Sequence, residues 1–422
     1  MDPGPSRAAV AVVLAAALLT ACGSGEDRDG TGPIVFADSR DTSRGAQIER
    51  LVKAWNDRNP REQVEMVELA ESSDDQRAQV VARAQDAEAA PEGERPSCFD
   101  VTTVDVIYTA EFARWGYIEP LDEDEFDHEA FLSKPLDSVR YKGKLWGIPL
   151  RSDVGLLYYR KDALTAAGVT APGTWDELRR QAQAIAPARK MQGYVTQLDR
   201  YEGFTVNVLE QIWDTGGGVL GTDGEVVAKP AALRKGFERL LQGVQAGWIP
   251  KDATDYNEER SRSTFQDGNA LFMRNWTYAY ELLSADDSPV ADTFGVAKLP
   301  TPSALGGWNL ALSSCSTNQR TALRFMRFLS SEASERALFT GAGFAPSRKA
   351  LYEDAALQRA HPHLSVLRAS IEDARNRGTS PYYHQVSATF QANLHDVLTR
   401  PDRLDQGLAG LRENLYRAAE GR

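Results

Sequence analysis

The sequence predicts an α/β protein built from two lobes. Its 422 residues exceed what one compact hydrophobic core usually holds. Near the N-terminus, apolar segments alternate between strand and helix periodicity, which is typical of a parallel sheet covered by helices. Farther along, the apolar runs 145–150 and 154–159 flank the polar triplet Arg151-Ser152-Asp153, where we expect the chain to pass from one lobe to the other.

The N-terminal residues predict export. Residues 8–20 form an unbroken apolar run after a single early positive charge, Arg7. The run is too short to span a bilayer as a helix and is typical of a signal-peptide core. It ends in Leu19-Thr20-Ala21-Cys22, which resembles a bacterial lipobox. We therefore expect a signal peptide at 1–21, a lipid on Cys22 and a tether at 22–32. The alternative is an ordinary secretory signal with an incidental cysteine.

The N-terminal region predicts the order β-α-β-α-β. Strands are expected at 34–37, 64–69 and 99–104. The first helix follows Ser43 as its cap and ends at Asn59-Pro60. Its apolar residues Ile48, Leu51, Val52 and Trp55 have the i, i+3, i+4, i+7 spacing of one helical face. A second helix is expected at 74–87. This order predicts parallel strands.

Later segments continue the α/β pattern. Thr174 and Glu177 form a capping box for a helix that runs to Ala186. Gly216-Gly217-Gly218 predicts a turn. It does not predict a phosphate-binding loop, because the Lys-Ser/Thr ending of such a loop is missing. Helices are expected at 231–246, 258–266, 321–329 and 332–339, strands at 293–298 and 310–313, and mostly helix from 364 onward.

Charge and cysteine content restrict the function. A net charge of −12 argues against nucleic acid as a partner, because phosphate binding needs a basic face. The five histidines form no close cluster with cysteines, so we expect no metal site and no cofactor. If Cys22 carries a lipid, Cys98 and Cys315 remain. They can form a disulfide only if both lie in one lobe, and the sequence leaves both states open.

The sequence favours binding over catalysis. It contains neither Gly-x-Ser-x-Gly nor His-Glu-x-x-His. The 60 Asp and Glu residues keep a glycosidase pair open as an alternative, because such a pair is defined by its separation in space. The acidic run 122–127 is expected to be a solvated loop.

Aromatic residues beside expected turns suit a carbohydrate ligand, because sugar rings stack on flat side chains. Trp276 and Tyr278 follow Arg274-Asn275, and Trp308 follows Gly306-Gly307. Asp105 and Asp153 lie at or between expected strands, where ligand crevices form. Each Trp could instead be a core residue, and each Asp a surface residue or helix cap.

Several segments carry a resemblance that covers 34–416. Leu157-Tyr158-Tyr159-Arg160-Lys161-Asp162 and Gly268-Asn269-Ala270 are the broader ones. Asn275-Trp276-Thr277-Tyr278, Asp286-Asp287-Ser288-Pro289 and Gly306-Gly307-Trp308 are narrower. Together they resemble the extracellular solute-binding proteins of ABC sugar importers (family 1), in particular the trehalose/maltose-binding branch. The resemblance implies the periplasmic-binding-protein type II fold, two α/β lobes with a hinge and a ligand cleft. The lobes would comprise 33–150 with 307–345, and 151–306 with 346–422.

The resemblance also implies the contacts in the cleft. Aspartates would accept hydrogen bonds from sugar hydroxyls, arginines would donate them, and aromatic rings would cover sugar faces. The residues implied in these roles are Asp105, Asp153, Arg77, Arg377, Trp276, Trp308 and Tyr278, with close approach at the Gly307 backbone. Arg44 and Arg151 depart from the family pattern, which has an acidic residue and an aromatic residue there. Trehalose, maltose, sucrose, another α-linked disaccharide and a modified sugar therefore stay open.

The function implied is that of a monomeric, lipid-anchored receptor on the outer face of the bacterial cytoplasmic membrane. It would bind an α-linked disaccharide and deliver it to the membrane permease of an ABC transporter, without catalysis. The alternatives are the same fold with a non-sugar solute, and a secreted glycoside hydrolase.

Overall fold

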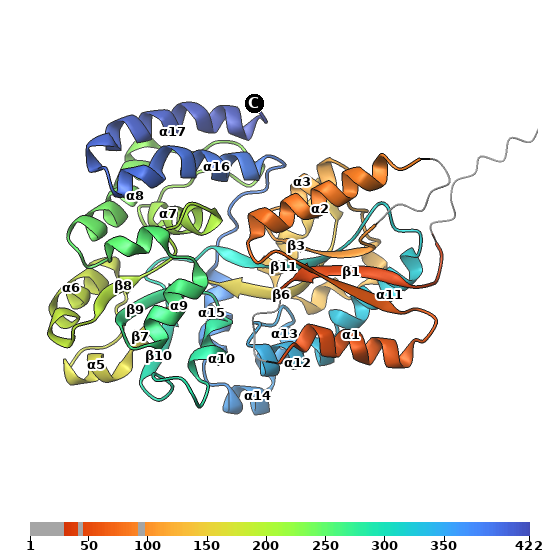
Figure 1. Ribbon diagram of the computed structural model, residues 1–422, viewed down its shortest axis with the longest axis horizontal. Coiled ribbons are helices and arrows are strands. Elements are labelled where there is room, and N and C mark those ends of the chain that lie inside the picture. The colour runs from red at the N-terminus through yellow and green to blue at the C-terminus, as the bar shows by residue number, and fades with distance from the viewer. Residues whose placement is uncertain (1–28, 41–44, 92–97) are drawn as a thin grey trace, which may run out of the picture.

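The computed structural model describes residues 29–40, 45–91 and 98–422, which fold into two α/β bodies (Figure 1). We call them the five-stranded lobe and the four-stranded lobe after their sheets, which have the orders β2-β1-β3-β11-β6 and β10-β7-β9-β8. The expected signal peptide, Cys22, Ser43 and Arg44 lie outside the described residues. Within the described ranges, no helix is both long and apolar enough to cross a membrane.

The five-stranded lobe begins with the predicted β-α-β-α-β unit, which is confirmed. Its elements are β1 (Ile34–Ser39), α1 (Gln47–Arg58), β2 (Val64–Leu69), α2 (Ser73–Glu88) and β3 (Val101–Asp105). β1 is parallel to both β2 and β3. Phe36 and Ala37 of β1 are fully buried, because helices cover both faces of a parallel sheet.

The strand β11 (Leu305–Leu312) joins distant parts of the chain. It lies antiparallel between β3 and β6 (Ile148–Val154). Its register places Trp308 opposite both Asp105 and Arg151. The strand expected at 310–313 thus begins earlier, and Gly306-Gly307-Trp308 lies in a strand and not at a turn.

The first crossing between the lobes lies at Gly155, between β6 and β7 (Leu156–Arg160). The triplet Arg151-Ser152-Asp153, expected between two strands, belongs to β6 and pairs with β11. Polar side chains are tolerated there because Arg151 has a buried ion-pair partner, Asp38. A second crossing leads from β10 (Phe294–Lys298) to β11.

The four-stranded lobe is completed by β8 (Gln192–Val195) and β9 (Ala270–Asn275), with β10 antiparallel to β7. Thr174 caps α6 (Trp175–Ile185) as predicted, but the Glu177 carboxylate accepts from the backbone of Gly173 at 2.8 Å and not from Thr174. The remaining helices are α3 (Thr109–Arg114), α4 (Ser133–Ser138), α5 (Lys161–Ala166), α6 (Trp175–Ile185), α7 (Glu202–Asp214), α8 (Pro230–Gln245), α9 (Glu258–Gln266), α10 (Ala279–Leu283), α11 (Gln319–Leu329), α12 (Glu332–Ala342), α13 (Lys349–Glu353), α14 (Ala355–Ala360), α15 (Leu364–Asp373), α16 (Tyr383–Leu394) and α17 (Leu404–Ala419).

Cys98 and Cys315 form a disulfide, with Cα atoms 5.9 Å apart. Cys98 precedes β3 and Cys315 follows β11, and these strands are antiparallel neighbours. Both cysteines therefore belong to the five-stranded lobe. The sequence alone left open whether they lie in one lobe, which the disulfide requires.

Candidate functional site

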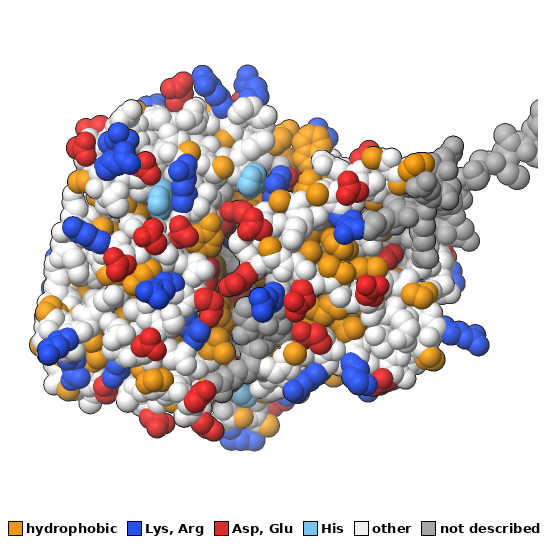
Figure 2. All heavy atoms as spheres, in the orientation of Figure 1, with side chains coloured by type: hydrophobic (Ala, Val, Ile, Leu, Met, Phe, Trp, Pro, Cys, Tyr) orange, Lys and Arg blue, Asp and Glu red, His pale blue; other side chains and the backbone are white. Residues whose placement is uncertain are grey.

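A cavity of about 980 Å³, including its open part, lies between the two lobes. Figure 2 shows a hollow between the lobes with acidic and basic side chains at its rim. The lining residues are Ser39, Arg40, Glu71, Ser72, Ser73, Asp105, Arg151, Asp153, Tyr201, Glu202, Gly203, Val206, Glu258, Trp276, Tyr278, Gly306, Gly307, Trp308, Phe344 and Arg377.

The cavity brings together most of the residues singled out from the sequence. Asp105, Arg151, Asp153, Trp276, Tyr278, Gly307, Trp308 and Arg377 all line it. Arg77 does not, because its guanidinium pairs with Glu111 of α3 away from the cavity. Arg44 lies outside the described residues.

The indole of Trp276 forms one flat wall. It directly follows β9, and its Nε1 donates to Glu258 at 3.1 Å. The guanidinium of Arg274 lies 3.9 Å from the ring centroid, a cation–π distance. Gly306 lies close to the same ring, since a Cβ there would come within 3.0 Å of it. The ring is therefore held at its edge and over its surface.

The indole of Trp308 forms a second wall, on the five-stranded lobe. The guanidinium of Arg151 lies 5.6 Å from its centroid and 4.8 Å from that of Phe344. Both terminal nitrogens of Arg151 donate to Asp38 at 3.1 Å. The departure from the family pattern at Arg151 is thus a buried bidentate ion pair that also borders the cavity.

Gly307 lets two strands approach closely at the cavity. Its φ of +117° is unfavourable for residues with a side chain. A Cβ at this position would lie 2.4 Å from the carbonyl oxygen of Arg151. Any larger residue would therefore disturb the pairing that positions Trp308.

Arg377 links the two lobes at the cavity. Its guanidinium donates to Asp105 at the end of β3 (3.2 Å) and to Glu202 at the start of α7 (2.6 Å). Asp105 also accepts from Ser73 at 2.8 Å. Because all three charged side chains are almost completely buried, the triad depends on this mutual pairing.

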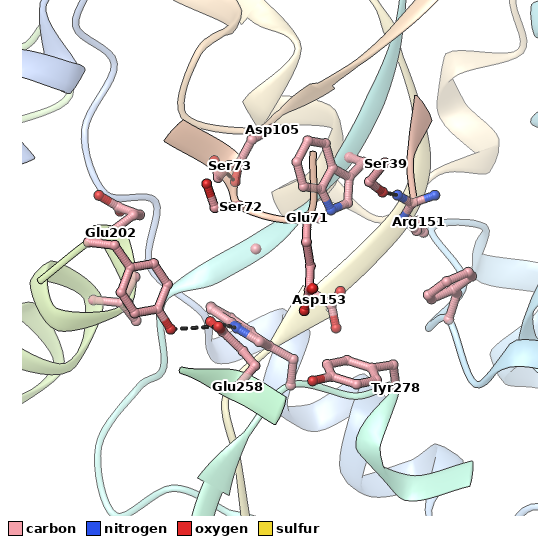
Figure 3. A pocket seen from close by; sticks show the side chains of 18 of the residues that line it. Ser39, Glu71, Ser72, Ser73, Asp105, Arg151, Asp153, Glu202, Glu258 and Tyr278 are labelled. Atoms are coloured by element: carbon pink, nitrogen blue, oxygen red, sulfur yellow. Dashed lines mark hydrogen bonds between the residues drawn. The ribbon is translucent and has the colours of Figure 1, made fainter. Parts of the chain in front are cut away.

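Three further carboxylates supply acceptors, and none of them forms a salt bridge within the described part of the chain. Glu71, Asp153 and Glu258 point into the same space in Figure 3. Glu71 follows β2, and burial and the negative charges of Glu259 and Glu258 raise its pKa. Asp153 accepts from the backbone of Thr277 through Oδ1 at 3.1 Å, which leaves Oδ2 available. The cavity thus offers flat apolar rings beside hydrogen-bond acceptors.

The raised pKa of the Asp153 carboxyl predicts that the stability of the protein depends on pH. Burial raises the pKa of Asp153 to about 6, against hydrogen bonds from Thr277 that lower it. The folded chain therefore holds this proton more tightly than the unfolded chain does. The contribution of Asp153 to the free energy of unfolding should fall as pH rises from about 4 to about 6, by at most about 3 kcal/mol, and stay level above. Urea unfolding from pH 4 to 8 measures this. Asp153→Asn should remove that component, and equal pH profiles for both proteins would contradict the prediction.

Sequence reasoning missed several lining residues, and part of the signal was available. Ser39-Arg40 lies at the end of β1, and Glu71-Ser72-Ser73 follows β2. The carboxyl ends of parallel strands share one edge, which is a usual ligand position, so the ends of β1 and β2 carried the same signal as Asp105 and Asp153. Tyr201-Glu202-Gly203 lies at the start of α7, a helix that the sequence analysis did not predict. Glu258 lies at the start of α9, a helix that it did predict.

The fold and the cavity define a two-lobed solute-binding protein. The model of the bacterial extracellular solute-binding protein family matches residues 39–336, and the chain belongs to this family. The chain is 36% identical over 292 residues to a probable ABC transporter-binding protein of Deinococcus radiodurans, an alignment covering 65% of this chain and 69% of that protein. It is therefore a solute-binding protein of the ABC-transporter type and not an enzyme.

Solved structures agree with this assignment. The maltose-bound MalE3 of T. maritima has a TM-score of 0.83 and 32% identity, and covers 91% of this chain and 98% of its own. The GacH receptor of Streptomyces glaucescens, solved unliganded and with acarbose, has a TM-score of 0.81, covering 92% of this chain and 99% of its own. At 22% identity, the second likeness concerns the fold alone.

Proposed function

We propose that the protein is a lipid-anchored receptor that binds an α-linked disaccharide, such as trehalose or maltose, and delivers it to an ABC permease. The observation that carries the proposal is the pair of indole rings, Trp276 and Trp308, that line one cavity from different lobes. Sugar faces stack on such rings, and a two-lobed site can close over its ligand by a hinge. The bound maltose of T. maritima MalE3 supports a ligand of this class.

The carboxylates fit a neutral, hydroxyl-rich ligand. Sugar hydroxyls donate hydrogen bonds, and Glu71, Asp153 and Glu258 have oxygens that face the cavity (Figure 3). Arg151 and Arg377 are committed to protein carboxylates. We therefore propose that the arginines shape the cavity while the three carboxylates accept from the ligand.

Calorimetric titration of the purified, ligand-free protein tests the proposal. Trehalose, maltose and sucrose form the disaccharide panel, and mannitol and a mixture of free amino acids are the comparison solutes. We expect saturable heat with at least one α-linked disaccharide, and full recovery of that sugar by chromatography after incubation. Heat only with the comparison solutes, or with none, would contradict the disaccharide proposal.

A further inference from the structure

A buried guanidinium lies against the ring of Trp276. Arg274 is 1% exposed, and its guanidinium carbon lies 3.9 Å from the indole centroid. Arg274 is absent from the cavity lining, although Trp276 belongs to it. Arg274 therefore does not itself contact a ligand in this cavity.

The guanidinium is fixed by a buried carboxylate of α7. Glu210, also 1% exposed, accepts from Nη2 of Arg274 at 2.8 Å and from Nε at 3.2 Å. Gln197 accepts from Nη1 at 3.3 Å. Bidentate pairing sets the plane of a guanidinium as well as its position. A lysine would keep the charge but not the plane.

The same pair reaches two of the crossings between the lobes. At the first crossing, a Cβ on Gly155 would lie 2.7 Å from Nη2 of Arg274, so the absence of a side chain makes room for the guanidinium. At the second crossing, the backbone N–H of Ala304 donates to Glu210 at 3.0 Å. The ring of Trp276 is thereby connected through Arg274 and Glu210 to two of the segments that join the lobes.

We propose that Arg274 is a positioning residue that fixes the indole of Trp276 against the crossings at Gly155 and Ala304, so that the ring keeps one orientation as a surface for the ligand. The ligand part of this inference rests on the proposed function, whereas the ring-positioning part does not. Glu210 sets the plane of the guanidinium, and Gly155 provides its space.

A double-mutant cycle tests the ligand part, with maltose and trehalose as probes in calorimetric titration. Arg274→Lys should weaken affinity about tenfold when Trp276 is present. In a Trp276→Ala background the same change should alter affinity less than twofold, because Arg274 acts through the ring. Equal losses in both backgrounds, or no loss in either, would overturn the inference.

Fluorine NMR of protein labelled with 5-fluorotryptophan tests the ring position without any ligand. Trp276→Phe assigns the signal of Trp276. Arg274→Lys should shift or broaden that signal. If Arg274→Lys does not fold, Gly155→Ala tests the same contact, because its added methyl group should displace the Arg274 guanidinium and so shift or broaden the Trp276 signal. Arg239→Lys is the matched control, because Arg239 lies 5.8 Å from the Trp175 centroid and pairs with Asp214. An unchanged Trp276 signal in the folded Arg274→Lys or Gly155→Ala variant would overturn the inference.

The two measurements separate the possible failures. If no sugar in the panel binds, the proposed disaccharide function fails, while the fluorine signal still decides whether Arg274 positions the ring. If sugar binds and Trp276→Ala leaves its affinity unchanged, the ligand part fails.

Discussion

Replacing Arg377 with methionine is expected to lower the free energy of unfolding by about 3–5 kcal/mol and to abolish measurable sugar binding. The substitution leaves Asp105 and Glu202 buried without their shared cation. Removing one partner of a buried ion pair is costly because the remaining charges stay uncompensated. The carbonyl oxygen of Leu305 loses a donor at 3.2 Å as well. Urea unfolding at pH 7 and calorimetric titration measure the two effects.

A pH series shows whether uncompensated charge causes the loss. Burial already raises the pKa of Glu202, and in Arg377→Met this pKa should rise further in the folded state because the neighbouring cation is gone. The variant should then recover stability relative to the natural protein as pH falls from 7 toward 5. Arg327→Met is the control, because its ion pair with Glu125 is exposed, and it should change stability by less than about 1 kcal/mol. A loss that does not vary with pH would indicate a packing defect and contradict the charge explanation.

Much of the fold could be predicted because its helices and strands have simple periodicities. α1 has one apolar face, with Ile48, Val52 and Trp55 buried. α7 was missed because nearly all of it is buried, including polar residues such as Asn207 and Glu210. A helix surrounded by protein has no solvent face to create a period. The start of α7 places Tyr201-Glu202-Gly203 at the cavity. Because the helix was not predicted, these lining residues were not predicted either.

The candidate site could be predicted where a residue type matched its surroundings, but pairing could not. Asp105, Trp276 and Trp308 were named from the sequence and do line one cavity. Arg77 was implied by the family resemblance alone, and its guanidinium pairs with Glu111 instead of lining the cavity. Asp38 was not considered, although it holds Arg151. Such pairs join residues far apart in sequence, and only the fold brings them together.

Both indole walls are supported by an arginine that belongs to a buried ion pair. Arg151 with Asp38 supports Trp308, and Arg274 with Glu210 supports Trp276. The arrangement fixes large flat rings at a cavity without filling it with other side chains. Preorganisation of this kind reduces the entropy lost on binding. The support differs between the walls, since Arg151 lines the cavity and Arg274 does not.

Removing the indole of Trp276 is accordingly expected to weaken disaccharide binding by roughly 10- to 100-fold, because a buried aromatic contact is among the most costly to truncate. Trp276→Ala removes the stacking surface and also leaves Glu258 without the Nε1 donor. Trp276→Phe keeps a ring but not that donor, so its smaller loss should separate stacking from the hydrogen bond. Trp115→Ala is the control, because Trp115 is 51% exposed and lies outside the cavity lining. Calorimetric titration with maltose and trehalose measures all three variants. Affinity unchanged in Trp276→Ala would remove this ring from the binding surface, whereas equal losses in the alanine and phenylalanine variants would assign the effect to the hydrogen bond with Glu258.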